Sequence, residues 1–183
     1  IKDQNYESAR ALAEWNNENP QLWFRVNRLE YTPTKFKNYL NKHEIKFEQF
    51  EFIPEFFQTW KHQELIKSDI FKEGKISIQD PAAGLVVKLV DPQKKESIID
   101  ACAAPGGKSS YAAELLKNTG YILSLDSNEN RLDRLDSTIS RLHITNTETD
   151  LIDITEDEVP MTGKMLLDVP CSGTGVMAKR ADI

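Results

Sequence analysis

The stretch D-A-C-A-A-P-G-G-K-S, residues 100–109, decides the fold of this chain. It follows a β-rich apolar run at 97–101 and precedes a helical pattern at 108–117. A turn between a strand and a helix is the place where a doubly wound sheet binds its ligand. Gly106 and Gly107 have no Cβ, so the backbone there can approach a ligand closely. Taken alone, the glycine pair is typical of an ordinary tight turn, and the surrounding pattern has to decide.

Strands and helices alternate on both sides of this turn. Apolar and β-rich runs predict strands at 97–101, 121–125, 147–150 and 165–169, and helical spacing predicts helices at 81–90, 108–117 and 128–142. This alternation predicts a parallel sheet with right-handed crossovers, so the fold class is α/β with a Rossmann-like domain. The fourth predicted strand lies close to Ile183, and we expect the domain to be truncated after it.

The first part of the chain has a different pattern, typical of a small α+β module. It predicts a helix at 3–17, a strand at 22–29, a helix that begins at Pro33 after the N-cap Thr32, and a strand at 47–52. Alternation along the first strand places Arg25 and Asn27 on the same side. Gly74 marks a break, so we expect one domain at 1–74 and another at 75–183, which opens with a short strand near 76–78.

Carboxylates follow the predicted strands of the second domain. Asp126 closes the second strand, about twenty residues after the glycines, the spacing at which a carboxylate meets a ribose. Asp153 and Asp168 close the third and fourth strand regions. S-adenosylmethionine is a sulfonium cation with a ribose, and it suits such an acidic pocket, whereas a pyrophosphate does not.

Two nucleotide-binding motifs are the alternatives to this interpretation. A phosphate-binding P-loop reads G-x-x-x-x-G-K-[ST], and here Cys102 stands where its first glycine is required. The dinucleotide fingerprint G-x-G-x-x-G is also missing. A P-loop nucleotide-binding protein therefore remains the weaker alternative.

A second motif, L-L-D-V-P-C-S-G-T-G at 166–175, begins in the fourth predicted strand and continues into the loop after it. An isolated cysteine is more often a buried structural residue. Asp168 stands three residues before Cys171, and two glycines follow it. This combination favours a functional cysteine beside the methyl donor.

Composition excludes several classes of protein. The net charge of -6 argues against a non-specific nucleic-acid binder, because such binding depends on neutralising phosphates. Two distant cysteines and three histidines without ligand spacing predict neither a disulfide scaffold nor a metal site. No apolar run is long enough to span a bilayer and no leader is evident, so we expect a cytoplasmic protein with no membrane partner.

Together, D-A-C-A-A-P-G-G-K-S, Asp126, Asp153 and D-V-P-C-S-G-T-G resemble the Sun family of RNA cytosine-5 methyltransferases. The resemblance extends through P-Q-L-W-F-R-V-N-R and G-K-I-S-I-Q-D-P-A-A, and covers the chain from about residue 19. It implies methylation of C5 of a cytosine in RNA, most closely in the manner of the bacterial enzymes that act on 16S ribosomal RNA, with S-adenosylmethionine as cofactor.

The resemblance also implies roles for single residues. Asp126 would hold the ribose, Asp153 would lie by the adenine, and Asp168 would contact both the donor and the target cytosine. The methionine part of the cofactor would be wrapped by seven consecutive residues: Cys102, Ala103, Ala104, Pro105, Gly106, Gly107 and Lys108. On the first domain, we expect RNA contacts from basic side chains that include Arg25, Arg28, Lys35 and Lys37.

In this family a thiolate adds to C6 of cytosine, C5 then takes the methyl group, a base removes the C5 proton and the thiolate leaves. The attacking cysteine belongs to a later Thr-Cys-Ser or Thr-Cys-Thr motif, which the chain does not contain. Cys171 matches the cysteine associated with product release, although DNA cytosine-5 methyltransferases use a Pro-Cys at this loop as nucleophile. We therefore expect the chain to be inactive alone. A non-catalytic module that binds RNA or the cofactor is the alternative.

Overall fold

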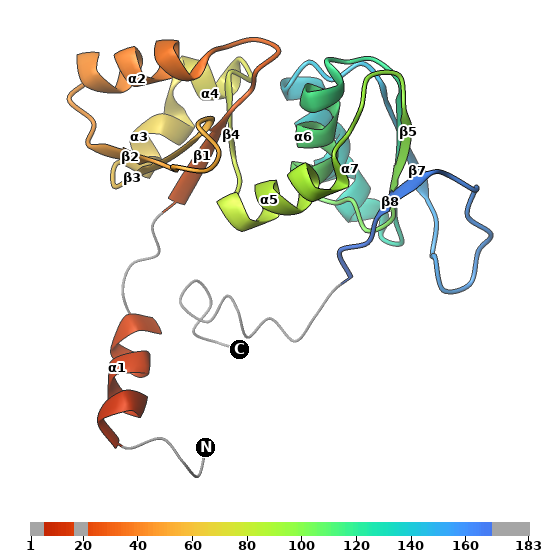
Figure 1. Ribbon diagram of the computed structural model, residues 1–183, viewed down its shortest axis with the longest axis horizontal. Helices are drawn as coiled ribbons and strands as arrows, with labels where there is room; N and C mark the ends of the chain where they lie inside the picture. The colour runs from red at the N-terminus through yellow and green to blue at the C-terminus, as the bar shows by residue number, and fades with distance from the viewer. Residues whose placement is uncertain (1–5, 17–21, 170–183) are drawn as a thin grey trace. The chain divides into compact units, whose positions relative to one another are not determined.

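The computed structural model describes residues 6–16 and 22–169 (Figure 1). Helix α1 (Tyr6–Asn16) confirms the first predicted helix and is described by itself, because the chain divides into two units and residues 22–168 form the other. An ion pair of 2.8 Å between Arg10 Nε and Glu14 Oε1 links successive turns of its exposed surface. None of the helices in the described stretches is long and apolar enough to cross a membrane.

The first half of the larger unit is built on an antiparallel sheet of four strands in the order β2-β3-β1-β4. Its strands are β1 (Leu22–Val26), β2 (Phe47–Gln49), β3 (Phe56–Thr59) and β4 (Ile76–Ile78). Helices α2 (Pro33–Lys42), α3 (His62–Lys67) and α4 (Asp69–Lys72) accompany it. Phe36, Leu40, Leu65 and Ile70 from these helices pack against buried residues of the sheet, so the helices cover one face.

Local sequence explains where these elements begin and end. Thr32 Oγ1 accepts a hydrogen bond from Lys35 N at 3.2 Å, and Pro33 takes the first helical position, which confirms the predicted start of α2. Strand β1 ends at Val26, earlier than predicted, because the fully buried Asn27 turns the chain: its Oδ1 accepts from Leu29 N at 3.0 Å.

The short strand expected to open the second domain belongs to the first sheet instead. Strand β4 pairs antiparallel with β1, with Phe24 opposite Ile78 and Val26 opposite Ile76. The pattern of a three-residue strand shows no partner, so the sequence alone could not assign it to a sheet. The division at Gly74 stays a prediction, and the first sheet extends past it.

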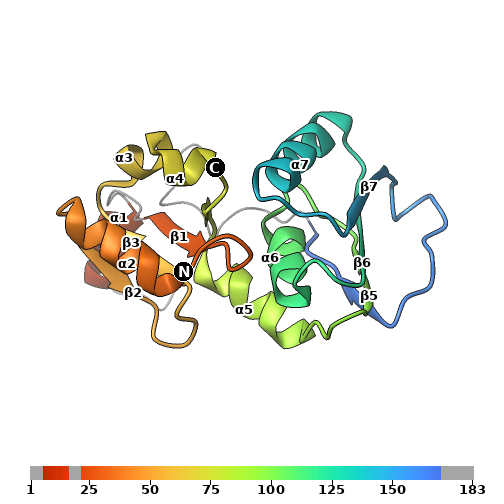
Figure 2. The ribbon, with the colours of Figure 1, turned by 90° about the horizontal axis from the view of Figure 1, so that it is seen from above.

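A parallel sheet in the order β7-β6-β5-β8 forms the second half, which confirms the predicted Rossmann-like fold. Its strands are β5 (Ser97–Asp100), β6 (Tyr121–Asp126), β7 (Thr147–Leu151) and β8 (Lys164–Leu166). Helices α5 (Pro81–Val90), α6 (Gly107–Leu116) and α7 (Glu129–Arg141) alternate with them. In both views α6 and α7 lie on one side of this sheet (Figures 1 and 2).

The second face of the antiparallel sheet is covered by α5 and α6. Phe56 of β3 packs in the same core as Val87 of α5 and Tyr111 of α6. A Cβ added at Gly84 of α5 would lie 2.5 Å from the Phe56 ring, so the helix approaches the sheet as closely as a glycine allows. Both faces of the small sheet are therefore covered at its two central strands, β1 and β3.

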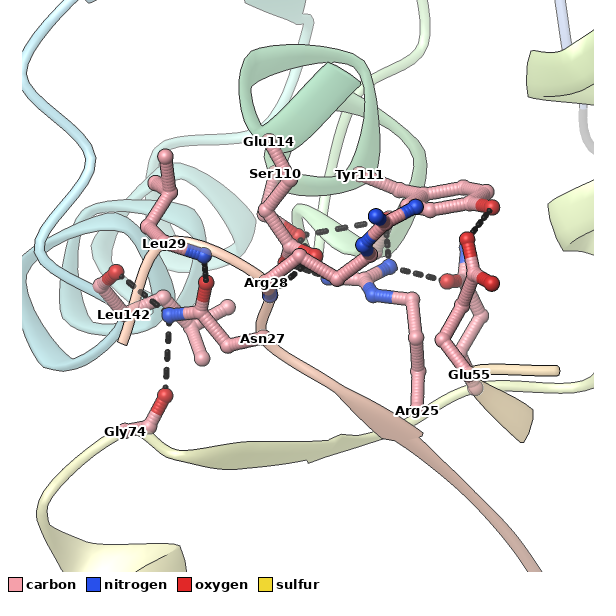
Figure 3. Close-up of polar contacts among 12 residues, drawn as sticks. Arg25, Asn27, Arg28, Leu29, Glu55, Gly74, Ser110, Tyr111, Glu114 and Leu142 are labelled. Carbon is pink, nitrogen blue, oxygen red and sulfur yellow. Dashed lines mark hydrogen bonds and ion pairs between the residues drawn. The ribbon is translucent and has the colours of Figure 1, made fainter. Parts of the chain in front are cut away.

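Asn27 and Gly74 complete the packing between the two halves of this unit. The Asn27 Nδ2 group donates to Gly74 O and to Leu142 O, each at 2.9 Å (Figure 3). Gly74 has φ +71°, and a Cβ there would stand 1.8 Å from the carbonyl oxygen of Arg141. The predicted break at Gly74 is thus a position where the end of α7 meets the first sheet.

Candidate cofactor site

The glycine turn, residues 101–107, lies where the parallel sheet changes its direction of winding. Strand β5 has β6 on one side and β8 on the other, although both come later in the chain. In open α/β sheets ligands bind beyond the carboxyl ends of the strands at this point. The turn between β5 and α6 therefore occupies the expected ligand position of the fold.

Both neighbouring strands hold the backbone of the turn. Ala101 N donates to Leu166 O of β8 at 2.9 Å, and Ala103 N donates to Leu125 O of β6 at 2.8 Å. Within the turn, Gly106 N donates to Ala103 O at 2.8 Å. The conformation of the turn is thus set by protein groups before any ligand binds.

Asp126 adds a side-chain contact from the end of β6. Its carboxylate is 2% exposed, and Oδ2 accepts from Ala104 N at 3.3 Å and pairs with the Arg131 guanidinium at 3.2 Å. Arg131 also donates to Ala104 O at 3.1 Å. Arg131 was not among the residues predicted for the site. A cation in the first turn of a helix opposes the helix dipole, and this unfavourable position was the available signal that it has a partner.

The two glycines of the turn differ in what the protein requires of them. Gly106 has φ +98°, and a Cβ there would lie 2.7 Å from Leu135 Cδ1, so the fold itself demands glycine. A Cβ at Gly107 would meet nothing closer than Gln79 Nε2 at 3.5 Å, an ordinary contact. Protein packing thus leaves room for a side chain at Gly107, and its bare backbone fits the close approach of a ligand.

Lys108, at the start of α6, forms an ion pair with Asp168, which follows β8. Behind them, the buried Asp100 accepts a hydrogen bond from Ser109 Oγ at 2.6 Å. Burial raises the pKa of Asp100, while the bond from Ser109 acts in the opposite direction. Asp100 and Ser109 were not predicted as site residues, although both stand inside the quoted motif.

Cys102 lies half-buried in the turn with a free thiol. Burial raises its pKa, and the negative charges of Asp126 and Asp100 raise it further. A thiol with a raised pKa is a weak nucleophile near neutral pH. The surroundings of Cys102 therefore suit a neutral thiol, and its predicted contact with the cofactor stays a prediction.

Asp153 follows β7 and organises its own turn. Its Oδ1 accepts from Thr155 N at 3.0 Å and from Thr155 Oγ1 at 2.7 Å, and these bonds lower the pKa of the carboxyl. The predicted contact with adenine stays a prediction. Cys171 lies outside the described residues, and the described stretches contain no cluster of side chains suited to a metal ion.

The structure corrects one member of the predicted RNA surface. Arg25 is 0% exposed, because the side of β1 to which alternation assigned it is covered by α6. An enclosed guanidinium has no surface with which to contact RNA. Arg28, Lys35 and Lys37 are exposed, as the prediction requires.

Comparison with known proteins decides the family. The model of the 16S rRNA methyltransferase RsmB/F family matches residues 87–183, more than half of the chain. The chain belongs to the RsmB/F family. A model of the ferredoxin-like domain of RsmF/B-like methyltransferases matches residues 1–58, which supports the resemblance stated from the sequence. The cofactor of this family is S-adenosylmethionine.

Individual relatives agree with this assignment. The ribosomal RNA small subunit methyltransferase B of Yersinia enterocolitica is 33% identical over 175 residues, and its probable counterpart in Bacillus subtilis is 29% identical over 182 residues. These alignments cover 94% and 97% of this chain, but only 41% and 40% of the relatives. The chain therefore spans about two fifths of the length of these proteins.

Solved structures agree on the fold. A methyltransferase homolog protein from Pyrococcus horikoshii is 32% identical and superposes with a TM-score of 0.81 over 93% of this chain and 57% of its own. The NSun6 protein of the same organism superposes with a TM-score of 0.80 over 90% of this chain and 67% of its own. Its identity of 19% supports the fold alone.

The difference between Gly106 and Gly107 predicts that a substitution at Gly107 affects ligand binding and that one at Gly106 affects folding. In Gly107→Ala the new methyl group should be accommodated by the protein, and alanine at a helical position should leave the melting temperature equal or slightly higher. The same methyl group would occupy the space of the cofactor, so affinity for S-adenosylhomocysteine should fall at least about tenfold, or 1.4 kcal/mol. Calorimetric titration and thermal unfolding measure the two effects. Unchanged affinity would remove Gly107 from the site.

Gly106→Ala is the matched control. It should lower the melting temperature, because its Cβ meets Leu135 and its φ is positive.

Proposed function

We propose that this chain binds S-adenosylmethionine at the glycine turn, and that the protein carrying it methylates C5 of a cytosine in 16S ribosomal RNA. The single observation that supports the cofactor site most is Gly107, whose missing side chain the packing of the protein does not explain. When bound, the cofactor supplies an electrophilic methyl group. The substrate is proposed from the family to which the chain belongs.

The residues of the turn suit the parts of this cofactor. Cys102 to Lys108 would surround its methionine part, and the ion pair of Lys108 with Asp168 would lie beside the sulfonium. Asp126 Oδ1 accepts one bond, from Asn128 N at 3.2 Å, so it has capacity for a ribose hydroxyl. Asp153, after the neighbouring strand, is proposed to lie by the adenine.

Methylation at C5 of cytosine requires a nucleophile, because C5 is unreactive until a thiolate has added to C6. The chain contains Cys102 and Cys171 and no Thr-Cys pair. The raised pKa of Cys102 makes it unsuited to this attack. We propose that the attacking thiolate comes from a later Thr-Cys motif of the full-length protein, that Cys171 assists the breakdown of the adduct, and that the chain by itself does not methylate.

A covalent-trapping experiment distinguishes the two roles of Cys171. Full-length protein with Cys171→Ala is incubated with 16S ribosomal RNA and S-adenosylmethionine, then run on a denaturing gel. If Cys171 assists product release, the adduct should persist and the protein should shift to a slower band. A loss of both band and methylation would make Cys171 the nucleophile and contradict the proposal. Cys102→Ala is the control, which should show no persistent band.

Arg28 and the α2 lysines Lys35 and Lys37 are proposed to contact RNA phosphates, since all three are exposed. Reversing the three charges to Glu should weaken RNA binding and reduce the slope of log affinity against log salt by about 2, because each phosphate contact contributes about 0.7–0.9. Binding is measured by fluorescence anisotropy at several salt concentrations.

The control for this prediction changes the net charge equally at a different place. Lys94, Lys95 and Lys117 are exposed near the start of β5 and the end of α6, and their reversal should leave the slope nearly unchanged. Equal losses in both triple variants would mean that overall charge, and not the α2 surface, determines RNA affinity.

A further inference from the structure

Arg25 is the largest of the fully buried side chains among the described residues. Burying a guanidinium is costly unless its charge and its N–H groups are paired. Arg25 belongs to β1, in the antiparallel sheet, and reaches across to α6 of the parallel half (Figure 3). Its position therefore depends on the contacts that it makes there.

The contacts of Arg25 follow one face of α6. The Nη2 atom donates to Glu114 Oε1 at 2.7 Å and to Ser110 Oγ at 3.1 Å, and Nη1 donates to Gly107 O at 2.9 Å. Residues 107, 110 and 114 are spaced by three and four, so they share the face that looks toward β1. The guanidinium also lies over the Tyr111 ring, 4.7 Å from its centroid.

Gln79, in the segment after β4, is a further hydrogen-bond partner of Arg25. Its Oε1 accepts from Arg25 Nη1, and its Nε2 is the atom that a Cβ at Gly107 would meet at 3.5 Å. Because a guanidinium can only donate, Arg25 determines which end of the Gln79 amide faces the glycine. Arg25 therefore bonds to the backbone of Gly107, and Gln79 lies beside the same residue.

The charge of Glu114 can be compensated without the hydrogen bond from Arg25 to Gly107 O. One ion pair compensates the buried carboxylate, and Arg28 N donates to its Oε2 at 3.3 Å as well. The bond to Gly107 O is additional: the carbonyl of a first-turn residue already has a partner in regular helical hydrogen bonding. Gly107 is also the residue whose backbone the cofactor is proposed to approach. The extra bond therefore acts on the position of that backbone.

We propose that Arg25 is a positioning residue for cofactor binding, which holds the Gly107 backbone from the antiparallel sheet. The inference rests on the proposed cofactor site and adds a residue from the first half of the chain. Arg25 is 0% exposed, so its proposed role is to hold the turn and not to contact the cofactor. It acts through the Gly107 carbonyl and the first turn of α6.

The test separates positioning from charge neutralisation. Arg25→Met alone leaves Glu114 buried without its cation, which lowers stability for a reason unrelated to the turn. The double variant Arg25→Met with Glu114→Gln removes both charges, so most of that stability should return. The hydrogen bond from residue 25 to Gly107 O stays absent in this variant. The double variant should therefore fold and still bind S-adenosylhomocysteine about tenfold more weakly than wild type, a loss expected for one hydrogen bond from a charged group.

A second measurement follows the turn without ligand. Ser110 N donates to Gly106 O at 2.9 Å, and its hydrogen-exchange rate reports on the first turn of α6. In the cofactor-free double variant this amide should exchange several-fold faster, while amides of α7 keep their wild-type rates. Should the double variant not fold, Arg25→Lys takes its place, since a lysine keeps the charge but cannot reach Glu114 and Gly107 together in one planar fork.

Arg141→Met is the matched control. Arg141 is a half-buried arginine of α7 that donates to two carbonyls of the first half, Phe71 O at 2.6 Å and Ile76 O at 3.0 Å, and has no bond to the glycine turn. Its replacement should lower the melting temperature without changing cofactor affinity or Ser110 exchange.

Two results would overturn the role of Arg25. One is full recovery of affinity and exchange in the double variant, which would reduce Arg25 to the counter-ion of Glu114. The other is an equal loss of affinity in Arg141→Met. If wild-type protein does not bind S-adenosylhomocysteine, the proposed function fails, and the Ser110 exchange rates still decide whether Arg25 holds the turn.

Discussion

The buried ion pair of Arg25 and Glu114 is the interaction on which the arrangement of the larger unit depends. Each charge would be strongly unfavourable without the other, so the two elements that supply them must stay in contact. The two side chains are 0% and 1% exposed, and burial raises the pKa of Glu114 to about 6 in spite of its partner. One strand of the antiparallel sheet is thereby tied to the helix that begins at the glycine turn.

The pair belongs to a wider set of polar contacts on the same surface. Tyr111 donates its hydroxyl to Glu55 Oε1 at 2.6 Å, and Asn27 bridges two backbone carbonyls (Figure 3). Side chains of this kind accept only particular partner positions, whereas apolar contacts tolerate small shifts. They explain how the backbone of the proposed cofactor site can keep its shape. The turn receives bonds from β6, from β8 and from Arg25.

Much of the parallel half could be predicted from the sequence, because its signals are local. The motif around Gly106 and Gly107, the stripe of α7 and the strand-end Asp126 each lie within one element and its neighbour. Alternation also placed Arg25 and Asn27 on the same side of the strand, and both side chains bond to the parallel half. What covers that side is a helix more than eighty residues away, and a pattern within one strand carries no information about it. The same limit explains β4, whose sheet depends on pairing with β1, and Arg131, whose partner lies in the preceding strand.

The central claim is that the glycine turn receives an adenosyl sulfonium cofactor and not a nucleotide phosphate. Titrating the chain with S-adenosylhomocysteine and, separately, with ATP and Mg²⁺ in a calorimeter tests it most directly. The account predicts one saturable site for S-adenosylhomocysteine and no binding of ATP at the same concentrations. Binding of ATP without binding of S-adenosylhomocysteine would contradict it, and would mean that the turn acts as a phosphate loop despite Cys102 at the position of its first glycine.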